Sequence, residues 1–481
     1  DRSAAASAQV AAFFGTASAS DFSVSAGQVS YSGPDEWSYR RFILHNAALC
    51  AASEGVEAFC IGSEMRSLTQ IRGAGDTFPA VARMIDLLRE VRALLGPDVK
   101  LVYAADWSEY FGYDAGGGTK YFHLDALWSD PDLDVIGIDN YMPLADWREG
   151  EEHRDHQSGW RSTYDLAYLK GNVAGGEGFD WYYDNAQGRD VQRRTPITDD
   201  QGEPWFWRYK DLRGWWENFH TDRIEGVQVA EPTEWVPRSK PVWFTEYGCP
   251  AVEKGANQPN VFLDPKSSES FAPYYSTGAR DDLIQMQYLR AMHDFWTDPA
   301  NNPVSPLYGG RMLDWSRSHV WAWDARPWPA FPAQNDVWSD SANWLTGHWL
   351  TGRAAAQPLA AVVAEICDMA GITSFDVSRL YGVVRGYSVA STASGRAALQ
   401  PLMLAHGFEA VERDGILVFR MRDGRDAVEL DPSTLVARDA GTLETARAPD
   451  PETAGRLRLT YVEAEGSDRK STRLNSSHLV I

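Results

Sequence analysis

Short apolar segments, each ending in a polar or acidic residue, alternate along this chain with segments of amphipathic helical period. The apolar runs are nearly continuous, which is typical of parallel strands that are buried on both faces. Acidic residues at or just after their ends are Glu64, Asp106, Asp139, Glu246 and Asp324. The pattern predicts an α/β fold in which helices cover a parallel sheet.

Five strands and three long helices are expected from this pattern. The strands are predicted at Val56–Gly62, Val99–Ala104, Leu133–Ile138, Val242–Thr245 and His319–Trp323. The helices are predicted from a cap at Asp35 to Gly55, over Val81–Leu95 and over Asp282–Trp296. A long insertion, Pro143–Ser239, interrupts the alternation and exceeds an ordinary connection.

Polar residues at the carboxyl ends of successive strands are the layout of a (β/α)8 TIM barrel. A doubly wound sheet is the main alternative, but no glycine-rich phosphate turn follows any of the strands. Too little chain precedes Asp35 for a full set of eight strands. We therefore expect an N-terminally truncated barrel that lacks its first two strands.

The composition changes after Arg353, and we divide the chain there. Residues 1–353 form the barrel and residues 354–467 a small α+β module, whose hairpin is predicted around Arg413–Gly415. Residues 468–481 match what a common sequencing adapter encodes in frame, so we expect an artefactual tail.

The charge and the cysteine content exclude several classes of function. A net charge of −22 argues against a nucleic-acid partner, which requires a basic face. No apolar run is long enough for membrane insertion. The four scattered cysteines form no metal-binding pattern, and we expect neither a metal nor a cofactor. Twenty Trp and 20 Tyr, many of them beside acidic residues, favour a carbohydrate ligand, although core packing and protein interfaces also use these residues.

Glu64 and Glu246 are the best catalytic candidates. Glycoside hydrolysis uses two carboxyl groups that face each other across the scissile bond, and opposite strand ends of a barrel can supply them. We count the strand before Glu64 as the fourth of the barrel and the strand before Glu246 as the seventh. The alternative is that both carboxyl groups make structural hydrogen bonds or ion pairs in an inactive barrel.

Other strand-end residues are candidates for substrate binding. They could bind sugar hydroxyls or tune the pKa of the glutamate pair, and Tyr141 could donate a hydrogen bond to a nucleophilic carboxylate. Each could equally be an ordinary cap or rim contact. The set is Ser63, Asp106, Trp107, Asp139, Asn140, Tyr141, Trp323 and Asp324. Glu109, which follows the same strand as Asp106 and Trp107, is a further candidate.

The chain resembles two groups of proteins. In the large clan of retaining TIM-barrel glycosidases, an acid/base Glu ends the fourth strand and a nucleophilic Glu ends the seventh, and Glu64 and Glu246 look like these residues. Many members have Asn before the acid/base residue, where this chain has Ser63.

The closer resemblance runs from about Ala8 to Arg353. It is to the glycoside hydrolase TIM-barrel-like baseplate or host-specificity protein of gene transfer agents and related phage tails. The module after it resembles the tail hub region of that family. The motifs that carry the resemblance are Tyr103–Gly112, Gly137–Pro143, Gly175–Tyr183, Phe244–Pro250, Gly255–Phe262 and Trp321–Pro327.

The resemblance implies a multi-domain protein of the virion or gene-transfer-agent tail tip, assembled in the bacterial cytoplasm. Its expected partners are cell-envelope glycan and other tail or baseplate proteins, in an oligomeric tail. If active, the barrel would hydrolyse O-glycosyl bonds with retention. The alternatives are a non-catalytic barrel that binds a receptor glycan and an architectural baseplate component, because fold alone does not establish activity.

Overall fold

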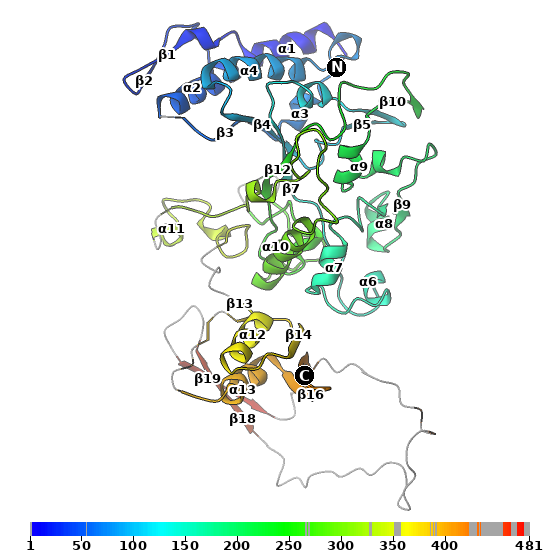
Figure 1. Ribbon diagram of the computed structural model, residues 1–481, viewed down its shortest axis with the longest axis vertical. Coiled ribbons are helices and arrows are strands. Elements are labelled where there is room, and N and C mark those ends of the chain that lie inside the picture. The colour runs from blue at the N-terminus through cyan, green and yellow to red at the C-terminus, as the bar shows by residue number, and fades with distance from the viewer. Residues whose placement is uncertain are drawn as a thin grey trace, which may run out of the picture. The chain divides into compact units, whose positions relative to one another are not determined.

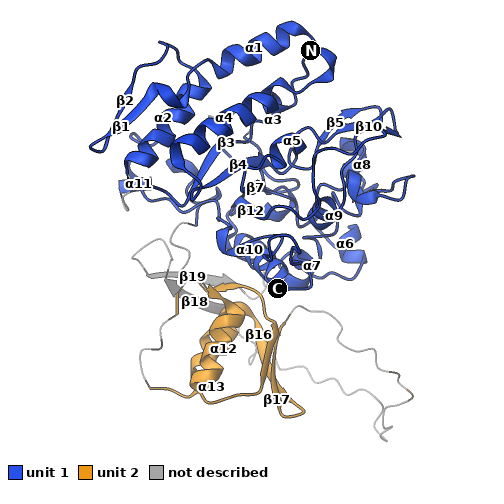
Figure 2. Cartoon of the chain, turned by 45° about the horizontal axis from the view of Figure 1, so that its top comes forward, with its two compact units in different colours: residues 1–352 blue, residues 353–481 orange. Residues whose placement is uncertain are grey.

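The computed structural model describes residues 2–53, 55–264, 267, 270–326, 330–350, 357–384, 386–387, 389, 392–422, 431 and 433, and the backbone of 456–462 and 469–475. Contacts divide the chain into two compact units, Asp1–Gly352 and Arg353–Ile481 (Figure 2). Each unit is considered by itself.

Unit 1 is a mixed α/β structure. Its helices are α1 (Ala4–Phe14), α2 (Tyr39–Ala52), α3 (Arg66–Thr69), α4 (Pro79–Leu95), α5 (Asp125–Trp128), α6 (Arg154–Gln157), α7 (Leu166–Gly171), α8 (Ala186–Asp190), α9 (Leu212–Glu217), α10 (Asp282–Trp296) and α11 (Ala330–Ala333). Its strands are β1 (Phe22–Ser25), β2 (Gln28–Tyr31), β3 (Ala58–Ser63), β4 (Lys100–Asp106), β5 (Tyr113–Gly116), β6 (Thr119–Tyr121), β7 (Val135–Asn140), β8 (Trp181–Tyr182), β9 (Thr195–Pro196), β10 (Arg223–Ile224), β11 (Val227–Gln228) and β12 (Val242–Tyr247).

A four-stranded parallel sheet in the order β12-β7-β4-β3 forms the centre of unit 1. Every residue of β7 is buried, as its continuous apolar sequence predicts. Helices α1, α2 and α4 pack together beside β3 (Figure 1). The apolar face of α4 buries Val81, Met84 and Leu88. The four predicted strands that precede Glu64, Asp106, Asp139 and Glu246 are therefore present.

Two sequence predictions differ from the structure in detail. Helix α2 begins at Tyr39 rather than near Asp35, because the Ser38 side chain caps it by accepting a hydrogen bond from the Arg41 amide at 3.3 Å. The predicted strand His319–Trp323 is wrong as a regular strand. Only Val320 forms a parallel bridge, to Tyr247 of β12. The reason is that the Ala322 amide bonds to the carbonyl of His348, away from the sheet.

In the described part of unit 1, the parallel sheet has four strands and continues beyond β12 only as isolated bridges. These described strands do not form a closed barrel. One bridge joins Val242 to Leu313 and the other joins Tyr247 to Val320. A mixed α/β fold with a parallel sheet is confirmed.

The insertion after β7 has short elements and an aromatic interior. Trp205, Trp215 and Trp235 are buried, and the rings of Trp215 and Trp235 stack with centroids 5.2 Å apart. Strands β10 and β11 of the insertion extend the β5–β6 hairpin into an antiparallel sheet, β11-β10-β6-β5. Much of the aromatic content therefore packs inside the unit instead of forming exposed platforms for sugars.

Unit 2 contains a small α+β module. Its elements are β13 (Gln357–Pro358), α12 (Leu359–Met369), β14 (Phe375–Arg379), β15 (Val383–Val384), α13 (Gly395–His406), β16 (Phe408–Arg413) and β17 (Ile416–Met421). The main sheet has the order β14-β17-β16. The predicted hairpin is confirmed between β16 and β17. Asp414 and Gly415 both have positive φ angles, 55° and 79°, which an Asp-Gly turn accommodates.

The end of the chain contributes a further antiparallel pair of strands, β18 (Arg456–Val462) and β19 (Arg469–Asn475). Strand β19 falls within the segment 468–481 that the sequence marks as an adapter-derived tail. The remaining residues of that segment, 468 and 476–481, lie outside the described residues.

Candidate active site at the strand ends

The parallel sheet gathers four carboxyl groups at one edge. Asp106 of β4 and Glu246 of β12 both pair with Asp139 of β7 in the strand register, and Glu64 directly follows β3. Because the carboxyl ends of parallel strands meet at the same edge, Glu246 helps to raise the pKa of Glu64, although the two residues are 182 positions apart in sequence. We call Glu64, Asp106, Asp139 and Glu246 the carboxyl cluster.

Glu64 stands at a turn with a left-handed backbone, with φ at 50°. Its amide donates to the carbonyl of Ala104 at 2.8 Å, and the next amide, that of Met65, donates to Tyr103 Oη at 3.0 Å. The pKa of Glu64 is raised to about 8, first by desolvation and then by Asp139, the other cluster members and Glu109. Glu64 is therefore protonated at neutral pH and is still accessible to solvent, as a proton donor must be.

Glu246 is half-buried at the end of β12. Tyr141 Oη donates to its Oε2 at 2.6 Å, a short charge-assisted distance. Burial raises the pKa of Glu246, and the hydrogen bond from Tyr141 acts in the opposite direction by stabilising the carboxylate. Burial together with Glu246 raises the pKa of the Tyr141 phenol, which therefore keeps its proton and remains a donor.

Asp139 is fully buried between the two glutamates' strands. It accepts hydrogen bonds from Ser63 Oγ at 3.0 Å and from Thr245 Oγ1 at 2.6 Å, and so links β3, β7 and β12. Burial, followed by the nearby charge of Glu246, raises the pKa of Asp139 to about 7. Ser63 and Asp139, both predicted to bind substrate, thus contact each other.

Glu109, which follows the same strand as Asp106 and Trp107, also belongs to the site. It is completely buried and accepts hydrogen bonds from Thr69 Oγ1 at 2.5 Å and from Tyr103 Oη at 3.0 Å. Burial raises its pKa to about 7. Tyr103 Oη also accepts a hydrogen bond from the Met65 amide, so Glu109 supports, through Tyr103, the turn that carries Glu64. Its position three residues after Asp106 is the only sequence signal for this role.

The remaining predicted residues lie around the cluster with other partners. The Asp106 side chain accepts from the Ser108 amide at 2.8 Å, and Asn140 Oδ1 accepts from the Met142 amide at 3.1 Å. The Trp107 ring lies 5.0 Å from that of Tyr209.

Trp323 and Asp324 belong to the segment that leaves the sheet after Val320. Trp323 is 69% exposed. Asp324 pairs with Arg326, and that ion pair lowers the pKa of Asp324. The Asp324 carboxyl group is therefore already paired with a residue of its own segment. Trp323 is the better placed of the two to contact a ligand.

Within the described ranges, no group of three or more His, Cys, Asp or Glu side chains has an arrangement that could hold a metal ion. Among the same residues, no helix combines the length and the apolar character needed to cross a bilayer.

Unit 1 is thus a mixed α/β domain whose parallel strands gather four carboxyl groups at one edge of the sheet. Residues 37–332 match the family described as "GTA TIM-barrel-like domain", and the chain belongs to this family. Residues 394–472 match the family described as "Putative phage tail protein". The resemblance to proteins of gene transfer agents and phage tails is therefore confirmed.

One similar solved structure is a chain of the "Virion of native gene transfer agent (GTA) particle". The two chains are 56% identical, the match covers 30% of the present chain and 33% of the other, and the TM-score is 0.27. The present chain thus spans about a third of the length of that protein. A comparison with curated proteins found no match.

Proposed function

We propose that this chain is part of a tail protein of a gene transfer agent or phage, and that its TIM-barrel-like unit hydrolyses host cell-envelope glycan with retention. The hydrogen bond from Tyr141 to Glu246, opposite a protonated Glu64, is the observation that carries this proposal. In this arrangement Glu246 is a carboxylate that accepts a hydrogen bond, and Glu64 is an acid that its surroundings keep protonated. This is the pair of roles that a retaining glycosidase requires.

The proposed reaction has two steps. In the first, the Glu246 carboxylate attacks the anomeric carbon while Glu64 gives its proton to the departing glycosidic oxygen, and a covalent glycosyl–Glu246 ester forms. In the second, the Glu64 carboxylate takes a proton from water, whose oxygen attacks the same carbon and releases Glu246. Tyr141 donates to Glu246 at the start and the end of the cycle and keeps its free carboxylate oriented.

We propose further that β3, β4, β7 and β12 are the fourth to seventh strands of a barrel. The parallel bridges from β12 to Leu313 and Val320 support an eighth position beside β12. The division of contacts after Gly352 supports a boundary near Arg353 between the barrel and the tail-hub-like module. Assembly in the bacterial cytoplasm into an oligomeric tail tip, with other baseplate proteins as partners, completes this proposal.

A non-catalytic role, either binding a receptor glycan or forming part of the baseplate architecture, is the second candidate. Ser63 favours it, because its hydroxyl proton is donated to Asp139 and so cannot be donated to a sugar 2-hydroxyl. The burial of Trp205, Trp215 and Trp235 favours it as well, since these rings stabilise the unit and are not available as a platform.

The test compares the full chain with its Glu64→Gln and Glu246→Gln variants. Each is incubated with purified peptidoglycan and with capsular polysaccharide, and new reducing ends are measured. We expect release by the parent and a loss of about 100-fold or more in both variants. Glu231→Gln, at an exposed residue, is the matched control and should keep full activity. Glycan that is retained on the protein without any release would instead support the non-catalytic role.

A further inference from the structure

A second polar cavity lies in the insertion, away from the carboxyl cluster. Its volume is about 200 Å³, and none of its lining residues belongs to the cluster. Its walls come from the chain after β7, around Asp146 and Asp155, from the segment around Trp181 and Arg194, and from Lys210. Neither the sequence motifs nor the proposed reaction assigns it a role.

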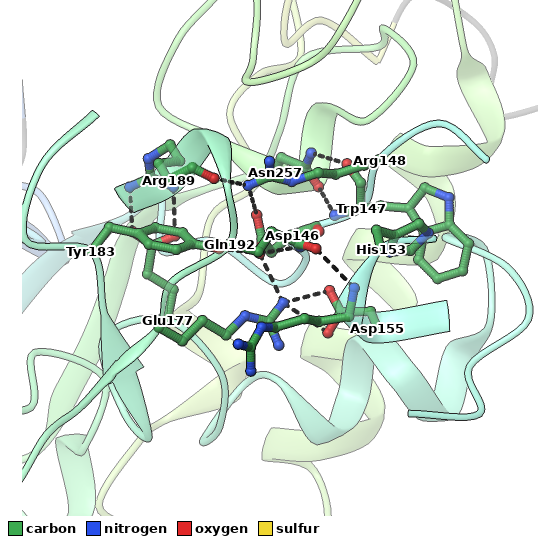
Figure 3. A network of polar contacts seen from close by, with 12 residues as sticks. Asp146, Trp147, Arg148, His153, Asp155, Glu177, Tyr183, Arg189, Gln192 and Asn257 are labelled. Carbon is green, nitrogen blue, oxygen red and sulfur yellow. Dashed lines mark hydrogen bonds and ion pairs between the residues drawn. The ribbon is translucent and has the colours of Figure 1, made fainter. Parts of the chain in front are cut away.

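A network of charged hydrogen bonds fixes the walls of this cavity (Figure 3). Asp146 is 5% exposed and accepts from Arg194 Nη2 at 2.8 Å, from Gln192 Nε2 at 2.9 Å and from Tyr183 Oη at 2.6 Å. Asp155 accepts from the same Arg194 nitrogen at 2.9 Å. Because these side chains hold one another, the cavity is formed before any ligand enters, which lowers the entropic cost of binding.

Some polar groups at the cavity keep unused hydrogen-bonding capacity. The Nε of Arg194 is buried without a hydrogen-bond partner among the described residues. Lys210 is 2% exposed and donates to the carbonyls of Asn172 and Gly175, each at 2.8 Å, which leaves one further position on its Nζ. Solvent does not reach the Arg194 Nε, so Lys210 is the donor that the cavity offers to a ligand that accepts hydrogen bonds.

Aromatic side chains form the other walls. Trp160 and Trp181 are half-buried, and Tyr168 is buried. The Arg194 guanidinium lies over the Trp181 ring at 4.1 Å, which fixes the orientation of that indole. Most of the surface that lines the cavity is polar, which suits a ligand that is rich in hydroxyl groups.

The charge and size of the cavity restrict its ligand further. Four carboxyl groups line it, Asp146, Asp155, Glu177 and Asp180, together with the cations Arg194 and Lys210. Arg148 also pairs with Asp146 and Arg189 with Glu177, so the charges around the cavity are close to balanced. A ligand that brought a further charge would leave that charge unpaired, which favours a neutral ligand. The cavity is large enough to hold several waters and hence a small polar ligand.

We propose that this cavity binds one neutral sugar unit and acts as a non-catalytic anchoring site for glycan. The binding itself does not depend on hydrolysis, and only the identification of the sugar as part of an envelope glycan rests on the proposed function. Asp180 and Ser158 are the exposed residues at the opening of the cavity. The Asp180 Oδ2 accepts from the Gly176 amide at 2.7 Å, which leaves Oδ1 for a sugar hydroxyl.

The test measures binding of free glucose, galactose, N-acetylglucosamine and glucuronate to the full chain by saturation-transfer NMR. We expect saturable binding of at least one neutral sugar and none of glucuronate. Ser158→Tyr should abolish it by filling the opening, and Asp180→Ala should weaken it about tenfold by removing a hydrogen bond to a charged group. Gln157→Tyr adds the same bulk at a neighbouring exposed residue outside the cavity and should leave binding unchanged.

Several results would overturn this proposal. They are the absence of saturable binding, binding that survives in both cavity variants, and tighter binding of glucuronate than of any neutral sugar. The Glu64→Gln and Glu246→Gln variants separate the two proposals. Sugar binding that persists in the parent without release of reducing ends leaves the anchoring site standing and refutes the hydrolase. If the parent hydrolyses glycan but binds no free neutral sugar, the hydrolase stands and the anchoring site is refuted.

Discussion

Replacing Asp139 with asparagine should stabilise unit 1 at pH 8 and leave its stability nearly unchanged at pH 4. Asp139 is fully buried beside Glu246, and its pKa is raised from 3.8 to about 7. Between pH 3.8 and pH 7, Asp139 therefore keeps its proton in the native protein, whereas the same residue loses it in the unfolded chain. Stability that is present below pH 3.8 is lost as the pH rises through 7.

The magnitude follows from that difference in pKa. At about 1.4 kcal/mol for each pH unit, the raised pKa corresponds to at most about 4 kcal/mol. The cluster opens to solvent at Glu64, which screens part of this penalty. We therefore expect the asparagine variant to be about 2 kcal/mol more stable at pH 8. The amide is of similar size to the carboxyl group, and the Ser63 and Thr245 hydroxyls can rotate to donate to it or accept from it.

Tryptophan fluorescence during urea unfolding measures this effect selectively, because all 20 tryptophans precede residue 350 and so lie in unit 1. The parent and the variant are compared at pH 4 and pH 8. Asp98→Asn, at an exposed aspartate, is the control and should show no such dependence on pH. An equal difference in stability at both pH values, or a variant less stable than the parent at pH 8, would refute the assignment of Asp139 as a buried proton-holding carboxyl.

Two further predictions concern the site and the second unit. Tyr141→Phe removes the hydrogen bond that favours the Glu246 carboxylate, so the pKa of Glu246 rises and the acidic limb of the hydrolysis profile should move up by about one pH unit; an unchanged acidic limb in an active variant would contradict the role of this bond. In α13, Leu402 is 4% exposed and Leu404 is 79% exposed. Leu402→Ala should destabilise unit 2 by about 2–4 kcal/mol and Leu404→Ala by less than about 0.5 kcal/mol, as measured by hydrogen exchange of the β16 and β17 amides; equal losses would show that this helix does not pack as described.

The sequence by itself predicted the elements whose signals are local. Helix α10 has the predicted bounds because Asp281 caps it and its apolar residues recur at helical spacing. The β16–β17 hairpin follows from the Asp-Gly turn between two strands. The apolar runs of the sequence stop just before Glu64 and Glu246, and the structure has Glu64 directly after β3 and Glu246 as the penultimate residue of β12.

The tertiary structure decided everything that depends on which segments meet. Glu109 became part of the site because Tyr103 and Thr69 converge on it, and no local pattern marks that convergence. The segment after Val320 leaves the sheet because the backbone of residue 348 supplies its hydrogen bonds instead. The cavity around Arg194 is formed by residues up to 67 positions apart, from Pro143 to Lys210. Such contacts depend on the energies of burial and pairing between distant residues, whereas a sequence pattern reports only on neighbours.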